Sequence, residues 1–380
     1  MTGSRLLVVD ARGGMHHIPR EKLVDVLRTG DLVVANDAAT LPASLQGIHL
    51  RSGEPVEVRL AGRRSLSTDI ADFTAVVFGA GDFHTRTEDR PHPPALAPGD
   101  TLALGPLSAT VTGLLGHARL ISLHFPGSSD EIWSGIARHG RPVQYAHVST
   151  ALALWDVWTP IASPPVAFEP PSAGFALDWQ AIAALRARDI GFATITHAAG
   201  ISSTGDAELD RRLPLDEPYD VPSSTASAIA RTRASGGRII AIGTTVVRAL
   251  EHSARRDGTV HAGRDIATER IGPGTRLRVV DAILTGVHER GTSHYELLRA
   301  FADDLTLTAA DDELAAHGYR PHEFGDSVLV IPTSENPHSS IPQHLTIFRS
   351  GSLPIVNVEY SPCAARKFFR LPDFALLPSR

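Results

Sequence analysis

The chain of 380 residues contains a single cysteine, Cys363, and has no long apolar run. One cysteine excludes an intramolecular disulfide framework and any cysteine-rich zinc or iron–sulfur site, which fits a reducing compartment. No stretch approaches the roughly 18 unbroken apolar residues of a membrane span, and the N-terminus lacks the apolar core of a signal peptide. The sequence therefore predicts a cytoplasmic protein with no membrane partner.

Lysine is almost absent, because only Lys22 and Lys367 interrupt a basic complement of 36 residues that is otherwise arginine. Guanidinium groups present planar forks that suit phosphate and carboxylate, but a drift in composition produces the same bias. The formal net charge of −6 excludes a broadly basic nucleic-acid coat. Arginines that bind nucleic acid would therefore have to gather on one face.

Common catalytic signatures are also missing. The chain has no Walker A loop, no G-x-G-x-x-G after a strand, no H-E-x-x-H and no G-x-S-x-G. Its 18 histidines are scattered, and the nearest approach to a metal cluster is His317 and His322 with Glu323. Their spacing does not match a metal-ligand pattern, so we predict no metal.

The length of the chain and the pattern of its apolar segments predict an α/β main domain with an inserted small all-β, barrel-like domain. Between residues 50 and 125, short β-rich runs alternate with Gly/Pro-rich breaks, as in a small barrel. The flanking segments, 1–49 and 126–332, alternate strands and helices and form a discontinuous main domain. Residues 333–380, rich in proline and serine turns, are expected to be a C-terminal extension.

Periodicity and capping signals set the expected elements of the main domain. The expected strands are 6–9, 32–35, 192–196, 238–242 and 277–284. The expected helices are 20–28, 128–137, 179–188, 223–233, 245–255 and 293–302, two of which begin with Ser-x-x-Glu capping boxes at Ser128 and Ser293.

The most informative local segment is IIAIGTTVVRALE at residues 239–251. An apolar strand breaks at Gly243, and Thr244 and Thr245 open a helix whose free N–H groups could hold an anion. Arg248 lies on the same helix face as Thr244 and could reach the same ligand. The alternative is a plain threonine cap, with Arg248 paired to Glu251 on a solvated face.

A second candidate segment is VVDAILTGVH at residues 279–288. Asp281 stands inside an apolar strand, where a carboxylate needs a partner. Thr285 and His288 follow in a loop at the carboxyl end of that strand, the usual position of ligands in open α/β sheets. His288 could transfer protons near neutral pH, and the alternative is a solvated loop histidine.

Six segments in order resemble the S-adenosylmethionine:tRNA ribosyltransferase-isomerase family of queuosine biosynthesis. The resemblance covers about residues 5 to 331. The segments are TGDLVVANDAATLPASL (29–45), PPSAGF (170–175), EPYDVP (217–222), GTTVVRALE (243–251), PGTRLRVVDAILTGVH (273–288) and YRPHEFGDSVLV (319–330).

The resemblance implies the same architecture, an α/β domain with an inserted barrel, and a specific transferase and isomerase reaction. The family uses S-adenosylmethionine as a co-substrate, with no metal. It transfers and isomerises the ribosyl moiety onto 7-aminomethyl-7-deazaguanine in tRNA, which gives epoxyqueuosine. The resemblance thus implies tRNA as a partner, while the oligomeric state is not readable from the sequence.

The same resemblance implies roles for individual residues. His288 would act as acid or base, Asp281 would orient or bind the cationic substrate, and Arg248 would hold a carboxylate or phosphate. The remaining predicted substrate-binding residues are Gly243, Thr244, Thr245, Thr285, Ser172, Gly174, Glu217 and Asp326.

Several polar family positions differ in this chain. Ala176, Arg212 and Leu215 stand where the family has histidines, and Ser44 stands where it has an arginine. This pattern favours a divergent member of the family. The alternatives are a paralogue acting on a small nucleoside or another non-tRNA acceptor, and a catalytically silent nucleoside-binding protein.

Overall fold

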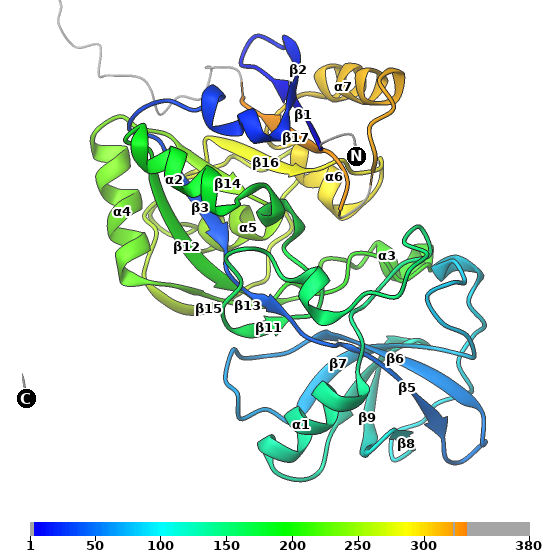
Figure 1. Cartoon of the computed structure of the whole chain (residues 1–380). Helices are drawn as coiled ribbons and strands as arrows, with labels where there is room; N and C mark the ends of the chain where they lie inside the picture. Colours follow the sequence, from blue (N-terminus) through cyan, green and yellow to red (C-terminus); the bar gives the residue numbers. More distant parts are fainter. Residues whose placement is uncertain (1–3, 322–323, 333–380) are drawn as a thin grey trace, which may run out of the picture. The chain divides into compact units, whose positions relative to one another are not determined.

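The computed structural model describes residues 4–321 and 324–332, so the expected C-terminal extension at 333–380 lies outside the described residues. The described strands form a nine-stranded mixed sheet, a closed six-stranded barrel and a two-stranded sheet (Figure 1). The α/β fold with a β-barrel expected from the sequence is confirmed.

The large sheet has the strand order β15-β13-β12-β3-β14-β16-β17-β1-β2. Strands β12, β3, β14 and β16 pair in parallel at its centre, whereas β13, β15, β17 and β2 each make an antiparallel pair. The strands are β1 (Arg5–Val9), β2 (Met15–Pro19), β3 (Leu32–Asn36), β12 (Gly191–His197), β13 (Glu217–Val221), β14 (Ile239–Ile242), β15 (Gly263–Ala267), β16 (Ala282–Gly286) and β17 (Ser327–Val330).

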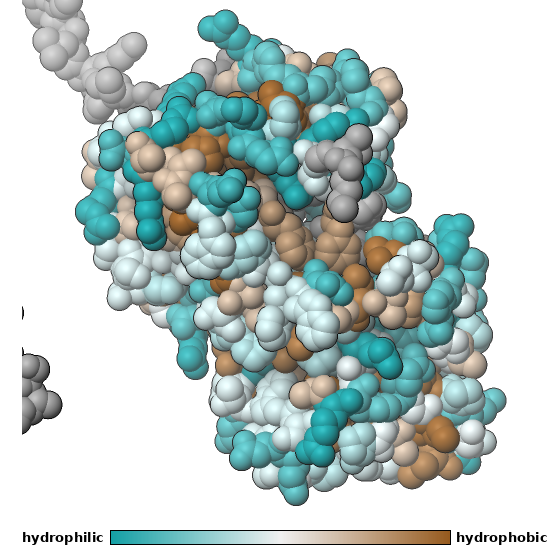
Figure 2. Space-filling view, in the orientation of Figure 1, coloured by the Kyte–Doolittle hydropathy of each residue, from teal (hydrophilic) through white to brown (hydrophobic). Residues whose placement is uncertain are grey.

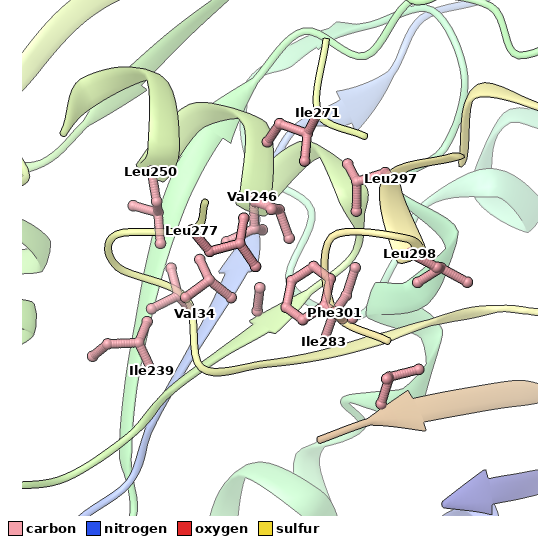
Figure 3. Packing of buried hydrophobic residues seen from close by; sticks show 14 of the residues in the cluster. Val34, Ile239, Val246, Leu250, Ile271, Leu277, Ile283, Leu297, Leu298 and Phe301 are labelled. Carbon is pink, nitrogen blue, oxygen red and sulfur yellow. The ribbon is translucent and has the colours of Figure 1, made fainter. Parts of the chain in front are cut away.

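The central part of this sheet is buried on both faces, because alternate residues of β1, β3, β14, β16 and β17 enter two separate cores. Val34 joins the core under α4 to α7 (Figure 3). Its neighbour Val33 joins the core under α2. The helices are α2 (Trp179–Ala187), α3 (Ala207–Asp210), α4 (Ser223–Ala234), α5 (Thr244–Ser253), α6 (Ser293–Leu298) and α7 (Asp304–Ala316). The 3-10 helices are η1 (Arg20–Val26), η2 (Thr87–Asp89), η3 (Leu154–Val157) and η4 (Ser172–Ala176).

The barrel is antiparallel throughout and closes between β9 and β10. Its strands are β5 (Ser44–His49), β6 (Pro55–Gly62), β7 (Asp72–Phe78), β8 (Thr101–Leu104), β9 (Leu107–His117) and β10 (Leu120–His124). Helix α1 (Ser129–His139) adds Ile132 and Ile136 to the barrel core, and its predicted capping box is present. The first barrel strand, β5, begins at Ser44, before the expected boundary at residue 50. The division of the chain into domains stays a prediction. The two-stranded sheet pairs β4 (Ala39–Thr40) with β11 (Pro165–Ala167).

Three buried arginines surround one phenylalanine of the barrel. The guanidinium carbons of Arg59, Arg90 and Arg119 lie 4.7, 5.3 and 5.2 Å from the centroid of the Phe78 ring. Glu57 accepts hydrogen bonds from Arg59 (2.7 Å) and from Arg90. A planar guanidinium can stack on a ring and pair with a carboxylate at once, which an ammonium group cannot do in the same way. Some of the arginine excess is therefore structural.

The carboxylate of Glu251 explains one error in the expected elements. The expected strand at 277–284 is shorter, since β16 begins only at Ala282. The backbone N–H groups of Val279 and Val280 each donate to Glu251 at 2.9 Å, as that of Arg278 does at 2.7 Å. A side chain thus replaces a neighbouring strand as the hydrogen-bond acceptor.

Two expected helices also differ from the structure. The segment at 20–28 is the 3-10 helix η1, whose hydrophobic residues Leu23 and Val24 are buried. Helix α6 begins after Thr292, whose hydroxyl accepts from the N–H of Tyr295, so Ser293 is not its cap. The helix ends at Leu298 rather than Ala302, because residues 299–301 form only shorter turns.

Hydrophobic residues form only small brown patches among polar residues on the face that Figure 2 shows. Within the described ranges, every helix is too short or too polar to cross a bilayer.

Replacing Glu251 by alanine should destabilise the fold strongly, because three backbone N–H groups would lose their acceptor. We expect the free energy of unfolding to fall by about 3 kcal/mol or more, given about 1–3 kcal/mol for each buried group left unsatisfied. Urea unfolding would measure the change, with Glu251→Gln as a milder variant and the exposed Glu54→Ala as a control. Equal losses in Glu251→Ala and Glu54→Ala would contradict the assigned role.

Candidate functional site

A cavity of about 670 Å³ lies at the carboxyl ends of the parallel strands β14 and β16. Ligands of open α/β sheets bind at this edge, where the loops after the strands supply the polar groups. Its walls come from segments far apart in the sequence, among them 86–88, 143–147, 169–173, 199–203, 243–248, 285–289 and 292–297, with Glu217 from β13. The residue types along these walls decide which chemistry the cavity can support.

The turn between β14 and α5 forms one wall. Gly243 has a φ of +96°, which glycine adopts without steric cost, and its N–H donates to the carbonyl oxygen of Leu284 at 2.8 Å. Helix α5 then begins at Thr244 with no side-chain cap, so the alternative of a threonine cap was wrong. The first N–H groups of α5 and two threonines border the cavity, an arrangement that favours an anionic group.

The guanidinium of Arg248 makes its hydrogen bonds within the protein. It pairs with Glu217 and donates to the carbonyl oxygens of Leu215 (3.1 Å) and Ala267 (3.0 Å). Its side chain is 5% exposed. The alternative pairing with Glu251 on a solvated face is also wrong, since Glu251 holds the backbone before β16.

Glu217 connects three elements at the floor of the cavity. Besides Arg248, it accepts from the N–H of Gly200 at 2.6 Å and lies 3.2 Å from Nε2 of His197. Burial alone would raise the pKa of Glu217, but Arg248, His197 and the Gly200 N–H outweigh burial and lower it to about 2. Nδ1 of His197 donates to the carbonyl oxygen of Thr245 at 2.8 Å, which ties the same network to the start of α5.

Two histidines face each other on another wall. Nε2 of His288 lies 2.7 Å from the hydroxyl of Thr285, and the centroid of its ring lies 4.7 Å from that of His294. Burial lowers the pKa of both imidazoles, and the neighbouring His294 lowers that of His288 further, well below its ordinary value. Both rings are therefore neutral near pH 7, the form in which histidine accepts a proton.

Tyr145 and Glu169 provide the third polar wall. The Tyr145 hydroxyl donates to Glu169 and also contacts the backbone of Ser203. Burial, with Glu169 beside it, raises the pKa of Tyr145 well above its ordinary value, so the phenol remains a donor. Arg59 of the barrel lies behind this wall, 5.6 Å from the centroid of the Tyr145 ring.

Eight of the eleven predicted site residues line the cavity. They are Ser172, Glu217, Gly243, Thr244, Thr245, Arg248, Thr285 and His288.

Asp281, Gly174 and Asp326 lie elsewhere, and we leave them out of the site. Asp281 precedes β16, at the opposite end of the strand, where it accepts from the N–H of Ile239 at 2.8 Å. Gly174 packs in η4, where a Cβ would lie 3.1 Å from Thr159. Asp326 binds the side chain of Arg5 (2.9 Å) and its N–H (2.8 Å). All three maintain local structure.

Sequence reasoning did not include Tyr145, Glu169, His197 and His294 among the site residues. They come from a loop after α1, the segment after β11, the end of β12 and the start of α6. No spacing connects these positions, so only the packing of distant segments identifies them. The closeness of Glu169 to the PPSAG segment was the one local signal available.

Comparisons with known proteins identify the family of this chain. A family model described as a queuosine biosynthesis protein matches residues 1–330. An S-adenosylmethionine:tRNA ribosyltransferase-isomerase of Ralstonia nicotianae is 32% identical over 90% of this chain and 92% of its own. That of Acaryochloris marina is 33% identical over 87% of each chain. The crystal structure of the S-adenosylmethionine tRNA ribosyltransferase from Thermotoga maritima is 24% identical, covers 87% of this chain and 93% of its own, and gives a TM-score of 0.45.

The depressed pKa of Glu217 makes acid stability a test of the network at the cavity floor. Its stabilisation is complete above the ordinary pKa of 4.5 and is lost as the pH falls toward 2. We expect a loss of about 3 kcal/mol over this window. Urea unfolding at several pH values would measure it, with Glu217→Met/Arg248→Met as the comparison. An unchanged pH slope in the double variant would contradict the assignment.

Proposed function

Because the chain belongs to the queuosine biosynthesis protein family, we propose that it is an S-adenosylmethionine-dependent tRNA ribosyltransferase-isomerase. The reaction moves the ribosyl moiety of S-adenosylmethionine onto 7-aminomethyl-7-deazaguanine in tRNA and isomerises it to an epoxycyclopentane. Adenine and methionine leave, and the product is epoxyqueuosine in the tRNA.

The observation that carries the proposal is the cavity at the carboxyl ends of β14 and β16 in a chain that matches the family over residues 1–330. Its volume of about 670 Å³ falls within the roughly 300–1,000 Å³ of small-molecule sites. It combines a helix N-terminus, two neutral imidazoles and a carboxylate–phenol pair, which together suit a zwitterionic and cationic co-substrate.

We assign the proton transfers to the two histidines. Neutral His288, oriented by Thr285, accepts the proton from C5′ beside the sulfonium. His294 lies against it, so the proton can pass through the pair to the departing adenine, which leaves as a neutral base. The two imidazoles therefore gain or lose no net proton. The attacking amine loses a second proton as its N–C bond forms, and that proton passes through Glu169 to solvent.

The other walls bind rather than react. The first N–H groups of α5, with Thr244 and Thr245, hold the carboxylate of the methionine moiety. Glu169, with the hydroxyl of Tyr145, accepts from an amine or from ring N–H groups of the substrates. Arg248 and Glu217 are positioning residues, because they contact each other and the backbone and fix the loop at Gly200.

A small nucleoside or another non-tRNA acceptor is the second candidate. The arginines that line the cavity are Arg86 and Arg248, and each is paired with a carboxylate of the chain, Glu88 and Glu217. The buried Arg248 is fully engaged, whereas Arg86 forms an exposed pair, so the cavity offers a phosphate backbone one accessible arginine. The histidine that the family has in the PPSAG segment is also replaced, by Ala176.

Incubation with S-adenosylmethionine and tRNA carrying 7-aminomethyl-7-deazaguanine should release adenine and add the epoxycyclopentane mass to the nucleoside. Chromatography measures the adenine, and mass spectrometry of digested tRNA measures the product. Adenine release with the free modified nucleoside but not with tRNA would support the second candidate. Failure to bind S-adenosylmethionine in calorimetry would remove both enzymatic functions.

Replacing His288 by alanine should lower the rate of adenine release by about 10²–10⁴-fold, because a positioned general base is lost. The Kd for S-adenosylmethionine should change only a few-fold, since the binding walls remain. His261→Ala is the matched control, because His261 is exposed and bonds Asp257 (3.0 Å) instead of lining the cavity. Full turnover by the His288 variant would remove this assignment.

A further inference from the structure

Three side chains that commonly bind metals converge away from the cavity, where strand β2 meets helix α7. His17 lies on β2, Glu313 lies in the last turn of α7, and His317 follows as the C-cap. Oε2 of Glu313 lies 3.2 Å from Nε2 of His17 and 3.2 Å from Nδ1 of His317. One ligand atom from each residue can be chosen so that all three lie within 4.8 Å of one another.

These separations are close to those of a zinc site. Tetrahedral Zn²⁺ with bonds of about 2.0 Å requires ligand atoms about 3.3 Å apart. The Glu313 oxygen is already at this distance from both imidazoles. The four-residue spacing places Glu313 and His317 on one face of the helix, and β2 brings His17 to the same face. The two imidazole rings lie against each other, with centroids 4.0 Å apart.

The imidazoles are also oriented by the protein. Nδ1 of His17 lies 3.0 Å from the hydroxyl of Tyr319, and Nδ1 of His317 lies 3.0 Å from the carbonyl oxygen of Glu313. In His17 this bond leaves Nε2 for an ion, which is the usual arrangement of histidine ligands. In His317 the nitrogen near Oε2 of Glu313 is Nδ1 itself, so an ion bound there would replace the bond to the carbonyl oxygen. The ring of Tyr319 is itself fixed under the guanidinium of Arg5, which lies 4.2 Å from its centroid.

The charge of the neighbourhood favours a cation. Helix α7 carries four carboxylates and no lysine or arginine. Asp311 and Asp304 are paired with Arg290 (2.6 Å) and Arg299 (2.8 Å), so the negative charge beside the cluster is that of Asp312 and Glu313. The nearby cation, Arg5, is paired with Asp326 at 2.9 Å. Two neutral histidines and one carboxylate would leave a fourth position for water, as in an open zinc site.

We propose that His17, Glu313 and His317 form a Zn²⁺-binding site. The site connects β2, at the edge of the large sheet, to the last described helix, so a bound ion stabilises this junction. It is separate from the cavity and does not depend on the proposed function. The site is partly exposed, with side-chain exposures of 31, 43 and 50% for His17, Glu313 and His317, and can exchange its ion with solvent.

Equilibrium dialysis of the untagged full-length chain against Zn²⁺ should show one ion bound per chain. His17→Ala and His317→Ala should each weaken the affinity at least about 10-fold, and Tyr319→Phe should weaken it by a smaller factor. His16→Ala is the matched control on the same strand, because its Nε2 bonds Asp10 at 2.9 Å instead of joining the cluster. Its affinity should equal that of the wild type.

A second readout is the Tm with and without Zn²⁺. The ion should raise the Tm of the wild type and of His16→Ala, but not that of His17→Ala/His317→Ala. If the double variant is unfolded without metal, Glu313→Gln serves in its place. A wild-type chain that binds no Zn²⁺, or stoichiometric binding that survives both Glu313→Gln and the double variant, would overturn the proposal.

Discussion

A buried ion pair between Arg248 and Glu217 is the constraint on which the cavity depends. The pair joins α5 to β13, and Glu217 continues the connection to the N–H of Gly200 and to His197. Two strands, one helix and one loop therefore share a single carboxylate. Removing either partner would leave a charge buried without compensation, which costs far more than an exposed pair is worth.

Burial and pairing, rather than the number of charges, set the electrostatics of the cavity. The net charge of −6 suggests an acidic surface. In the cavity, however, the negative charge of Glu217 is balanced by Arg248, and both histidines are uncharged because they are desolvated. Glu169 has the phenol of Tyr145 beside it. The cavity thus offers hydrogen-bonding groups with defined protonation states, which proton transfer requires.

The sequence predicted most of the elements, because periodicity and capping are local properties. The barrel strands, the Ser128 capping box and the turn at Gly243 all arise from residues that are neighbours in the chain. The errors occurred where a distant group replaced a local one. Glu251 took the hydrogen bonds expected for a strand before Ala282, and Asp281 found its partner in the backbone N–H of Ile239, at the end of β16 away from the cavity.

By itself, the sequence determined the succession of strands and helices along the chain and the glycine turn before α5. It also contained the ordered segments that identify the family. Only the tertiary structure decided the partners of the polar side chains. Arg248 binds Glu217 instead of a ligand, three arginines surround Phe78, and His17 meets Glu313 almost 300 residues away. The physical reason is the separation along the chain over which each interaction acts. Helix and strand formation depend on residues a few positions apart, whereas a buried charge finds its partner only when the packed cores bring distant segments together.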